Sequence, residues 1–377
     1  MRVVLDATPL LGQRTGIGVY TQRLLRELAL LAGAPGAPPL EIAATAFTWR
    51  GLDDLAAELP PGVTPAARRV PARLLREAWA RSEAPPLELL TGPADVIHAT
   101  NFVLGPTHRA RGVLTVHDLA YLTHTGTVGA DSARYRELVP RGLRRAAAVL
   151  TPSRAVADAV IDTYRLPPSL VTATPLGVEE DWFTAAPPEP GWLAAHGLPQ
   201  RYLVFLGTRQ PRKNLATLLR AYRDLRDQIP DAPALVLVGP DGWGPDLDLT
   251  GLPAGSVVTA GYLPAEQTRA VVAGSVALCF PSLDEGFGLP PLEALAAGVP
   301  VVAADIPAVR ENLGRLAGQA VRLAPPTDAD ALADALAAVL ATEGAYDPEP
   351  GRAHARTFSW RRTAQLTAAV YAAVASR

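Results

Sequence analysis

The sequence predicts an α/β protein made of two doubly wound, Rossmann-like domains that face a central cleft. Three observations carry this prediction. Short apolar runs alternate with helical patterns along the whole chain, which is typical of parallel sheets covered by helices. The length of 377 residues exceeds what one hydrophobic core usually organises. The alternation pauses once, in a proline-rich stretch at 183–192, and then begins again.

The first domain is predicted over 1–185. A buried-strand run at 2–7 leads through a glycine-rich turn into an amphipathic helix, in which Tyr20, Leu24 and Leu28 share one face. Ser153 is placed to cap another helix, because it stands directly before the helical pattern "RAVADAVIDTY". Further strands are predicted in "ADVIHAT", "GVLTVHD" and "AAAVLTPS".

The second domain is predicted over 191–357, behind a stiff linker indicated by Pro187, Pro188 and Pro190. Open α/β sheets bind ligands at the carboxyl ends of their strands, so a cleft between two such domains suits a reaction between a nucleotide-borne group and a second molecule. One more amphipathic helix is predicted over 358–377. The strands of the second domain are predicted in "RYLVFLG", "ALVLVG", "VALCFPS" and "VPVVAAD".

Composition and charge exclude several classes of protein. The net charge of −2 excludes a nucleic-acid surface, and the single cysteine, Cys279, is expected in the core and excludes a disulfide framework. No signal peptide or membrane-spanning run is visible, so we expect a cytoplasmic protein. The arginine-rich stretch 68–81 predicts either a solvated helix face or a peripheral contact with the inner face of an anionic membrane.

The segment "PSLDEGFGLPPLEALAAGVPVVAAD" (281–305) carries the strongest chemical signal. Glu285 lies in a glycine loop after a strand, and Glu293 follows eight residues later, in what we expect to be the first turn of a helix. Glycines let the backbone approach a ligand, and a helix N-terminus offers amides to an anion. A phosphate at the amides with hydroxyls at the carboxylates describes a sugar nucleotide. Alternatively, the two glutamates only complement the helix dipole.

The segment "GTRQPRKNL" contains Lys213, which is the only lysine in the chain. The preceding strand ends in Gly207 and a helix begins near Asn214, so Arg212 and Lys213 are expected at the carboxyl end of a strand. Arginine grips phosphate through its planar fork, and lysine adds a compact charge. Two solvated loop cations are the alternative interpretation.

Two weaker signals lie in the first domain. "TGIGVY" is a glycine turn without the full dinucleotide fingerprint. His117 and Asp118 end a strand that points toward the predicted cleft. His98 ends the preceding strand and is expected to be a hydrogen-bonded core residue. The histidine spacing does not suit a metal, and no ligand cluster accompanies it, so no metal site is predicted.

Taken together, these segments resemble the retaining GT-B glycosyltransferases of family GT4, in the family's order and over nearly the whole chain. The resemblance rests on the E-x7-E motif from Glu285 to Glu293, on "GTRQPRKNL" as the phosphate segment and on "HDLAYL" as the His-Asp segment. "GYLPAEQ" (261–267), with Leu263, is similar to the turn that supports the nucleotide base. One departure is Thr15-Gly16, where many members carry two adjacent glycines.

The resemblance implies a role for each matching residue. Arg212 and Lys213 bind the donor diphosphate next to Gly207, and Glu285 contacts hydroxyls of the transferred sugar. Glu293 binds the ribose, and His117 lies beside the transferring sugar. Gly16 approaches the diphosphate from the first domain, and the helix with Trp360 crosses back to that domain. The loop whose backbone amides hold sugar and phosphate comprises Gly286, Phe287, Gly288 and Leu289.

The resulting prediction is a hexosyltransferase of the mannosyltransferase-like branch, with GDP-mannose as the leading donor. It uses a nucleoside-diphosphate sugar as substrate, and needs neither a metal nor a further cofactor. Retention is expected through attack on the face from which the phosphate leaves. A glycan, a lipid-linked molecule or a natural product remains open as acceptor. The alternatives are a GT-B nucleotide-sugar epimerase, an NAD-dependent dehydrogenase and a noncatalytic sugar-nucleotide binding module.

Overall fold

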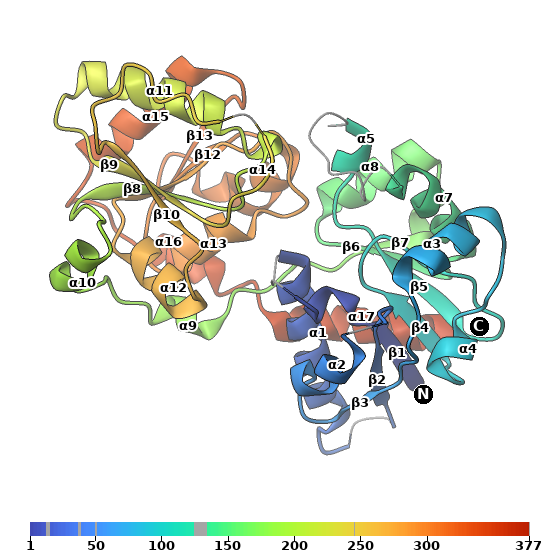
Figure 1. Ribbon diagram of the computed structural model, residues 1–377. Coiled ribbons are helices and arrows are strands. Elements are labelled where there is room, and N and C mark those ends of the chain that lie inside the picture. Colours follow the sequence, from blue (N-terminus) through green and yellow to red (C-terminus); the bar gives the residue numbers. More distant parts are fainter. Residues whose placement is uncertain (13–15, 37–38, 50, 124–133, 245, 377) are drawn as a thin grey trace. The chain divides into compact units, whose positions relative to one another are not determined.

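The structure is a computed structural model, and it describes residues 1–12, 16–36, 39–49, 51–123, 134–244 and 246–376 (Figure 1). The chain divides into two compact units. Unit 1 consists of Met1–Gly177 together with Ser359–Arg377, and unit 2 consists of Val178–Phe358. Each unit contains one parallel sheet with helices on both faces, as the alternating pattern predicts (Figure 1).

The described part of unit 1 forms a seven-stranded parallel sheet in the order β3-β2-β1-β4-β5-β6-β7. Its central strands are buried on both faces, which explains why their sequences are continuous apolar runs. The strand order reverses between β1 and β4, and such a switch point opens a crevice at the strands' carboxyl ends. The strands are β1 (Arg2–Asp6), β2 (Glu41–Thr45), β3 (Val63–Pro65), β4 (Val96–Ala99), β5 (Arg111–Thr115), β6 (Ala148–Thr151) and β7 (Val171–Ala173).

The helices of unit 1 include one from the far end of the chain. α17 packs along α1, and Tyr371 of α17 is fully buried in this unit. Ser153 caps α8 by accepting a hydrogen bond from the amide of Val156, as predicted. The helices are α1 (Gly16–Ala32), α2 (Leu52–Glu58), α3 (Ala72–Arg81), α4 (Glu88–Thr91), α5 (Ala120–Thr123), α7 (Tyr135–Arg145), α8 (Arg154–Tyr164) and α17 (Trp360–Ala375).

The described part of unit 2 forms a six-stranded parallel sheet in the order β10-β9-β8-β11-β12-β13. Here the order reverses between β8 and β11. The loops that follow these two strands therefore meet at the switch point. Cys279 lies fully buried in β11, as predicted. The strands are β8 (Tyr202–Leu206), β9 (Ala234–Val238), β10 (Val257–Gly261), β11 (Ala277–Phe280), β12 (Val301–Ala304) and β13 (Val321–Ala324).

Helices α11 and α15 cover one face of this sheet and share a core with β8, β9 and β11. Each fully buried leucine in that core contributes roughly 1.5–3 kcal/mol. Asp328 caps α15 by accepting a hydrogen bond from the amide of Ala331. The helices are α9 (Glu180–Phe183), α10 (Pro190–Ala195), α11 (Leu215–Gln228), α12 (Ala265–Ala273), α13 (Leu289–Ala296), α14 (Pro307–Leu313), α15 (Ala329–Ala341) and α16 (Glu349–Ala355).

The boundary between the units differs from the expected linker at 183–192. The chain passes from unit 1 to unit 2 between Gly177 and Val178, and it returns between Phe358 and Ser359. The proline segment belongs to unit 2, because Pro187 and Pro188 pack so closely on Gly274 that a Cβ there would lie 2.8 Å from Pro188 Cδ. Pro190 does not continue a linker but opens α10, where a first-turn proline loses no hydrogen bond.

Among the residues that the structure describes, no helix combines the length and the apolar character that crossing a bilayer requires.

Candidate active site

At the switch point of unit 2, the loop that contains Arg212 and Lys213 lies against the loop that contains Glu285. The first loop follows β8 and contains a short 3-10 helix, Pro211–Lys213. The second follows β11 and contains Glu285. The amide of Leu283 donates to the carbonyl of Arg212 at 2.8 Å, so the two loops are joined by their backbones. Asn214 strengthens this junction, because its side-chain amide donates to the carbonyl of Pro281 at 3.0 Å.

Glycines at the ends of β8 and β9 allow a third loop to lie directly on the first. A Cβ on Gly239 would lie 2.2 Å from the carbonyl oxygen of Gly207, and one on Gly242 would lie 2.2 Å from that of Arg209. Real Cβ atoms do not approach a backbone oxygen this closely, so any side chain at either position would push the loops apart. The loop that carries Arg212 and Lys213 is therefore held in place by backbone packing.

Arg212, Lys213 and Glu285 form an ionic cluster, which we call the charge triad. Lys213 Nζ lies 2.6 Å from Glu285 Oε1, and Arg212 Nη1 lies 3.0 Å from Glu285 Oε2. The three side chains are only 21%, 12% and 9% exposed in the order of their numbers. Lys213 Nζ also lies 5.3 Å from the centroid of the Phe280 ring, a cation–π contact. The sequence prediction named all three residues.

The charge triad fixes the ionisation of Glu285. Burial alone raises the pKa of this carboxyl, but the charges of Lys213 and Arg212 outweigh burial and lower the pKa to about 2. Glu285 is therefore a carboxylate at any pH near neutrality. It can accept hydrogen bonds from hydroxyl groups, and it cannot serve there as a proton donor.

The loop between Glu285 and α13 is shaped by Gly288. Gly288 precedes the helix with φ at +83°, a left-handed conformation that side chains disfavour. The carbonyl of Phe287 accepts a hydrogen bond of 2.7 Å from Asn312, whose own carbonyl accepts one of 2.6 Å from His354. The predicted anion-binding backbone, from Gly286 to Leu289, is thus supported from α14 and α16.

The expected position of Glu293 in the first helical turn is wrong. Because Gly288 turns the chain into the helix, α13 begins at Leu289, and Glu293 is its fifth residue. The side chain is partly buried and does not belong to the charge triad's ion pairs. Burial and the charge of Glu179 raise the pKa of Glu293 to about 8. A hydrogen bond from Trp182 and the charge of Arg269 oppose this rise.

Leu263 follows β10, at the same edge of the sheet. Its carbonyl accepts a hydrogen bond of 3.1 Å from Thr268, which ties the turn to the start of α12. The side chain is partly buried, while the adjacent Tyr262 is 59% exposed. Gly261 contributes to this edge as well, since its carbonyl accepts from the amide of Gly239.

His117 lies just beyond β5 in unit 1 and is buried. Its Nε2 lies 2.8 Å from the carbonyl oxygen of Thr100, so Nε2 carries the proton and Nδ1 is the ring's acceptor. Its ring meets Tyr20 and Phe102 edge to face, at 5.0 and 5.6 Å between centroids. Burial lowers the pKa of His117, although the Thr100 carbonyl and Asp118 act against it. The ring is therefore neutral.

His98 is a structural residue, as predicted. Its Nδ1 lies 2.6 Å from the hydroxyl of Tyr371, and its Nε2 lies 2.7 Å from that of Thr115. Burial lowers its pKa to about 3, so it is neutral as well. Through Tyr371, His98 anchors α17 to the sheet of unit 1. Gly16, the other predicted residue of this unit, is the exposed first residue of α1.

Several residues at these sites were missed by the sequence prediction. Asn214 and Asn312 hold the loops of unit 2, and Glu179 and Trp182 surround Glu293. The segment containing Glu179 gave no signal, because it stands just before the prolines that were interpreted as a linker. Within the described residues, no group of three metal-ligating side chains gathers at one place.

Comparisons with known proteins identify the family. The family described as "Glycosyl transferases group 1" matches residues 200–342, and "Glycosyltransferase Family 4" matches residues 14–182. The "O-antigen chain mannosyltransferase B" of Escherichia coli is 31% identical over 285 residues, which cover 73% of this chain and 74% of that protein. The "MMP alpha-(1->4)-mannosyltransferase" of Mycolicibacterium hassiacum is also 31% identical, over 62% of this chain and 56% of its own.

Solved structures show the same fold. Anabaena HepE, crystallised with UDP-glucose, has a TM-score of 0.71 at 17% identity and covers 99% of this chain and 100% of its own. The sucrose-phosphate synthase of Thermosynechococcus elongatus has a TM-score of 0.65 at 20% identity, and the match covers 100% of this chain and 96% of that one. These matches lend no support to an epimerase or a dehydrogenase. The chain belongs to the group 1 glycosyltransferases of family 4, and it has the GT-B fold, with two Rossmann-like units.

Proposed function

We propose that this glycosyltransferase moves a mannosyl group from GDP-mannose to a hydroxyl group of its acceptor, with retention of anomeric configuration and without a metal ion. The observation that carries the proposal is the charge triad at the switch point of unit 2. Two cations and one carboxylate, all largely buried, leave one net positive charge where an open α/β sheet binds its ligand.

The triad can bind a diphosphate without being taken apart. A guanidinium has five N–H donors and an ammonium has three, and Glu285 takes one from each. Arg212 Nη1 also donates to the carbonyl of Asp284 at 3.1 Å. Both cations still offer positive charge to a diphosphate beside them. The loop that leads into α13 adds backbone amides up to Leu289, because Pro290 and Pro291 have no N–H. As the anomeric bond breaks, negative charge grows on the leaving phosphate, and these fixed donors stabilise it without rearrangement. This is the role that we assign to the chain's only lysine.

Glu285 and His117 are suited to sugar hydroxyls. Glu285 is ionised, because its pKa is about 2, and so it accepts hydrogen bonds from the transferred hexose. His117 is neutral and protonated on Nε2, which leaves Nδ1 as an acceptor. Neither group is suited to protonate the leaving phosphate. A phosphate oxygen of the donor then takes the acceptor's proton while the acceptor attacks the same face of the sugar.

The choice of donor rests on the relatives. Two of them are named as mannosyltransferases at 31% identity. HepE, which shares the fold, was solved with UDP-glucose, so a nucleotide sugar suits this architecture. Glu293 is assigned to the ribose and Leu263 to the base. The acceptor class is a glycan, a lipid-linked molecule or a natural product. An exposed Leu74 beside the arginines of α3 supports a peripheral contact with an anionic membrane for the lipid-linked case.

Thermal unfolding with GDP, UDP, dTDP, ADP and NAD tests the donor. A ligand at about 100 times its Kd stabilises the protein by roughly 2.7 kcal/mol, which raises Tm measurably. We expect GDP to raise Tm most and Lys213→Ala to remove the effect. Arg209→Ala is the matched control, because Arg209 is a cation of the same loop that pairs with Asp241. A shift by NAD alone contradicts the proposal.

Product analysis tests the chemistry. With GDP-mannose and a hydroxyl acceptor, NMR of the product should show an α-linked sugar, as in the donor, and activity should persist in EDTA. A β-linked product rules out retention. Activity that EDTA abolishes and Mg²⁺ restores rules out metal independence. A change in the sugar without transfer to any acceptor favours an epimerase instead.

A further inference from the structure

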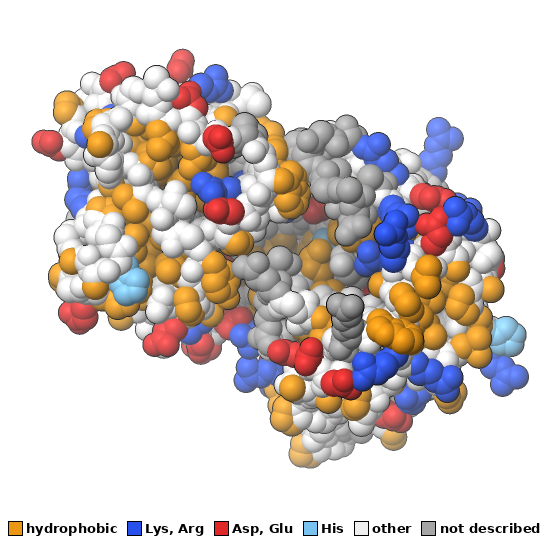
Figure 2. All heavy atoms as spheres, viewed as in Figure 1, with side chains coloured by type: hydrophobic (Ala, Val, Ile, Leu, Met, Phe, Trp, Pro, Cys, Tyr) orange, Lys and Arg blue, Asp and Glu red, His pale blue; other side chains and the backbone are white. Residues whose placement is uncertain are grey.

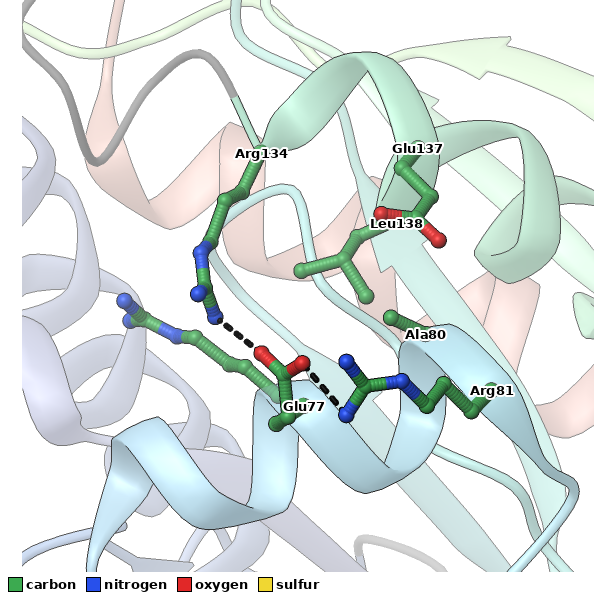
Figure 3. A pocket seen from close by; sticks show the side chains of 7 residues that line it. Glu77, Ala80, Arg81, Arg134, Glu137 and Leu138 are labelled. Carbon is green, nitrogen blue, oxygen red and sulfur yellow. Dashed lines mark ion pairs between the residues drawn. The ribbon is translucent and has the colours of Figure 1, made fainter.

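A second cluster of cations lies in unit 1, in a pocket between α3 and α7 (Figure 3). The pocket has a volume of about 160 Å³. Figure 2 shows blue basic side chains with red acidic ones between them over these two helices. Three arginines and two glutamates leave the lining with one net positive charge. The lining residues are Arg76, Glu77, Ala80, Arg81, Arg134, Glu137 and Leu138.

Glu77 bridges two of the arginines. Its Oε1 lies 2.5 Å from Arg81 Nη1, and its Oε2 lies 3.0 Å from Arg134 Nη1. Figure 3 shows the two guanidinium groups reaching this carboxylate from two segments, one from α3 and one from the residue that precedes α7. The three side chains remain 35% (Glu77), 74% (Arg81) and 39% (Arg134) exposed, so a ligand can reach them. The carboxylate thus marks a position where an anion is held between two forks.

Arg76 adds a third cation. Among the residues that the structure describes, its side chain makes neither a hydrogen bond nor an ion pair. Burial raises the pKa of Asp6. The hydrogen bonds from Thr8 and the positive charge of Arg76 act in the opposite direction. Asp6 ends β1, at the edge of the sheet where open α/β folds bind ligands, and the charge of Arg76 acts on it.

The pocket also borders the surroundings of His117. Tyr135 follows Arg134 in the chain and stacks on Phe102, with 4.8 Å between ring centroids. Phe102 meets His117 at 5.6 Å, and it has φ at +59°, a conformation that costs energy for a bulky residue. Aromatic contacts therefore connect Tyr135, the chain neighbour of the pocket residue Arg134, to the histidine that we assign to the transferring sugar.

We propose that this pocket binds a phosphoryl group of the acceptor substrate, an inference that rests on the proposed transferase function. Guanidinium forks match phosphate geometry. A phosphate carries about −1.5 to −2 charges and three acceptor oxygens, so it competes with Glu77 for Arg81 and Arg134, whereas a single carboxylate only equals Glu77. The acceptor would then be a phosphorylated sugar or a lipid phosphate, with its hydroxyl directed toward His117.

Isothermal titration calorimetry of the full-length chain with inorganic pyrophosphate measures whether the pocket binds a phosphoryl group. The donor site is first weakened by Lys213→Ala or, where that variant does not fold, by Arg212→Gln. In this background, Arg134→Gln and Arg76→Gln should each weaken binding about tenfold, as expected for lost hydrogen bonds to a charged group. Glu77→Gln should strengthen binding, because it releases two guanidinium groups. Arg154→Gln removes a charge of unit 1 outside the pocket and should change nothing.

The opposite signs make the test decisive. If the only role of Glu77 is to hold α3 against α7, then Glu77→Gln and Arg134→Gln both loosen the pocket, and both weaken pyrophosphate binding. That outcome overturns the proposal, as does binding that none of the pocket variants changes. Circular-dichroism melting of each variant identifies those that fail to fold.

Two further probes distinguish the sources of the phosphate. A hexose 6-phosphate represents soluble acceptors, and phosphatidylcholine vesicles carrying a polyprenyl phosphate represent lipid acceptors. Binding of either probe that Arg134→Gln weakens supports the pocket and identifies its ligand. Binding of neither overturns the proposal. The GDP-induced Tm shift should be unaffected by Arg134→Gln, so loss of the donor proposal and loss of the pocket proposal give separate results.

Discussion

The strand ends of unit 2 contain paired charges, whereas those of unit 1 contain neutral histidines. In unit 2, two cations lower the pKa of the buried Glu285 to about 2, so that Glu285 stays ionised. In unit 1, burial lowers the pKa of His98 to about 3, and its ring nitrogens are satisfied by hydroxyl groups. Both solutions avoid an isolated buried charge, which proteins do not tolerate.

The difference separates the kinds of ligand that each edge suits. Fixed charges in a largely buried site favour an anionic ligand, because water does not screen them well. A neutral imidazole offers one acceptor to a hydroxyl group and little to an anion. We therefore expect changes in unit 2 to affect charge stabilisation, and changes at the histidines of unit 1 to affect packing and hydrogen bonding.

The largest expected effect is on catalysis, from Lys213→Ala. The change removes one donor to the leaving phosphate and leaves Glu285 with a single cation, so kcat/KM for transfer from GDP-mannose should fall about 10²–10³-fold. Arg209→Ala, in the same loop, should leave the rate close to wild type. If kcat/KM fell equally in the two variants, only the overall charge of the loop would matter for transfer. That result would contradict a special role for the charge triad.

The next effect is on stability, from His98→Ala. The change leaves a cavity and removes partners from the buried hydroxyl groups of Tyr371 and Thr115, so the free energy of unfolding should fall by about 2–4 kcal/mol. Urea denaturation measures it. His108→Ala is the control, since that side chain is exposed. A loss below 1 kcal/mol, about the value of one hydrogen bond, would show that α17 is anchored by other contacts.

A smaller effect, with opposite signs, is expected for the two glutamates. The pKa of Glu293 is raised from its usual 4.5 to about 8. Between these pH values the folded state binds one proton more than the unfolded state, so stability falls as pH rises through this range. The free energy of unfolding of Glu293→Gln should therefore increase relative to wild type as pH rises from 5 to 8. The expected change is about 1 kcal/mol, because solvent screening reduces the effect.

Glu285 should behave in the reverse way. Its pKa is lowered to about 2, so its contribution is present above pH 4.5 and is lost as pH falls toward 2. Glu285→Gln should thus be less stable than wild type at pH 7, and the difference should shrink in acid. Melting curves of both variants across pH check this. Parallel pH profiles for the two would contradict the assignment of their environments.

The smallest effect is the absence of a titration. Because burial lowers the pKa of His98 to about 3, its ring-proton chemical shifts should stay constant between pH 6.5 and 8. Burial lowers the pKa of His117 as well, so its shifts should change less in this range than those of a free imidazole. Free imidazole in the same buffer serves as the reference. A ring that titrates in this range would carry a positive charge at the strand ends of unit 1, and the contrast between the units would disappear.

Much of the fold was predictable because its signals are local. The cap at Ser153, the strand ends before Gly207 and Glu285, and the helix opened by prolines after Gly288 all depend on a few adjacent residues. Other elements were not predicted. β2 reads "EIAAT", and its alanines favour a helix unless a sheet buries them.

The environments of site residues were less predictable than their identities. Glu293 was found by its spacing, but its raised pKa depends on burial and on Glu179, which lies more than a hundred residues earlier in the chain. The pocket of Arg76 and Arg134 arises only because α3 and α7 pack together, although about sixty residues separate them. Long-range packing of this kind leaves no short pattern in one sequence.

The return of α17 to unit 1 has a consequence for biosynthesis. Unit 1 needs Tyr371 to satisfy His98, but residues 359–377 leave the ribosome only after all of unit 2 has been made. The contiguous unit 2 can therefore complete its fold first, although it comes second in the chain. Until then the groove for α17 is open along α1, so a nascent chain or a truncated product exposes an apolar surface that chaperones and proteases can recognise.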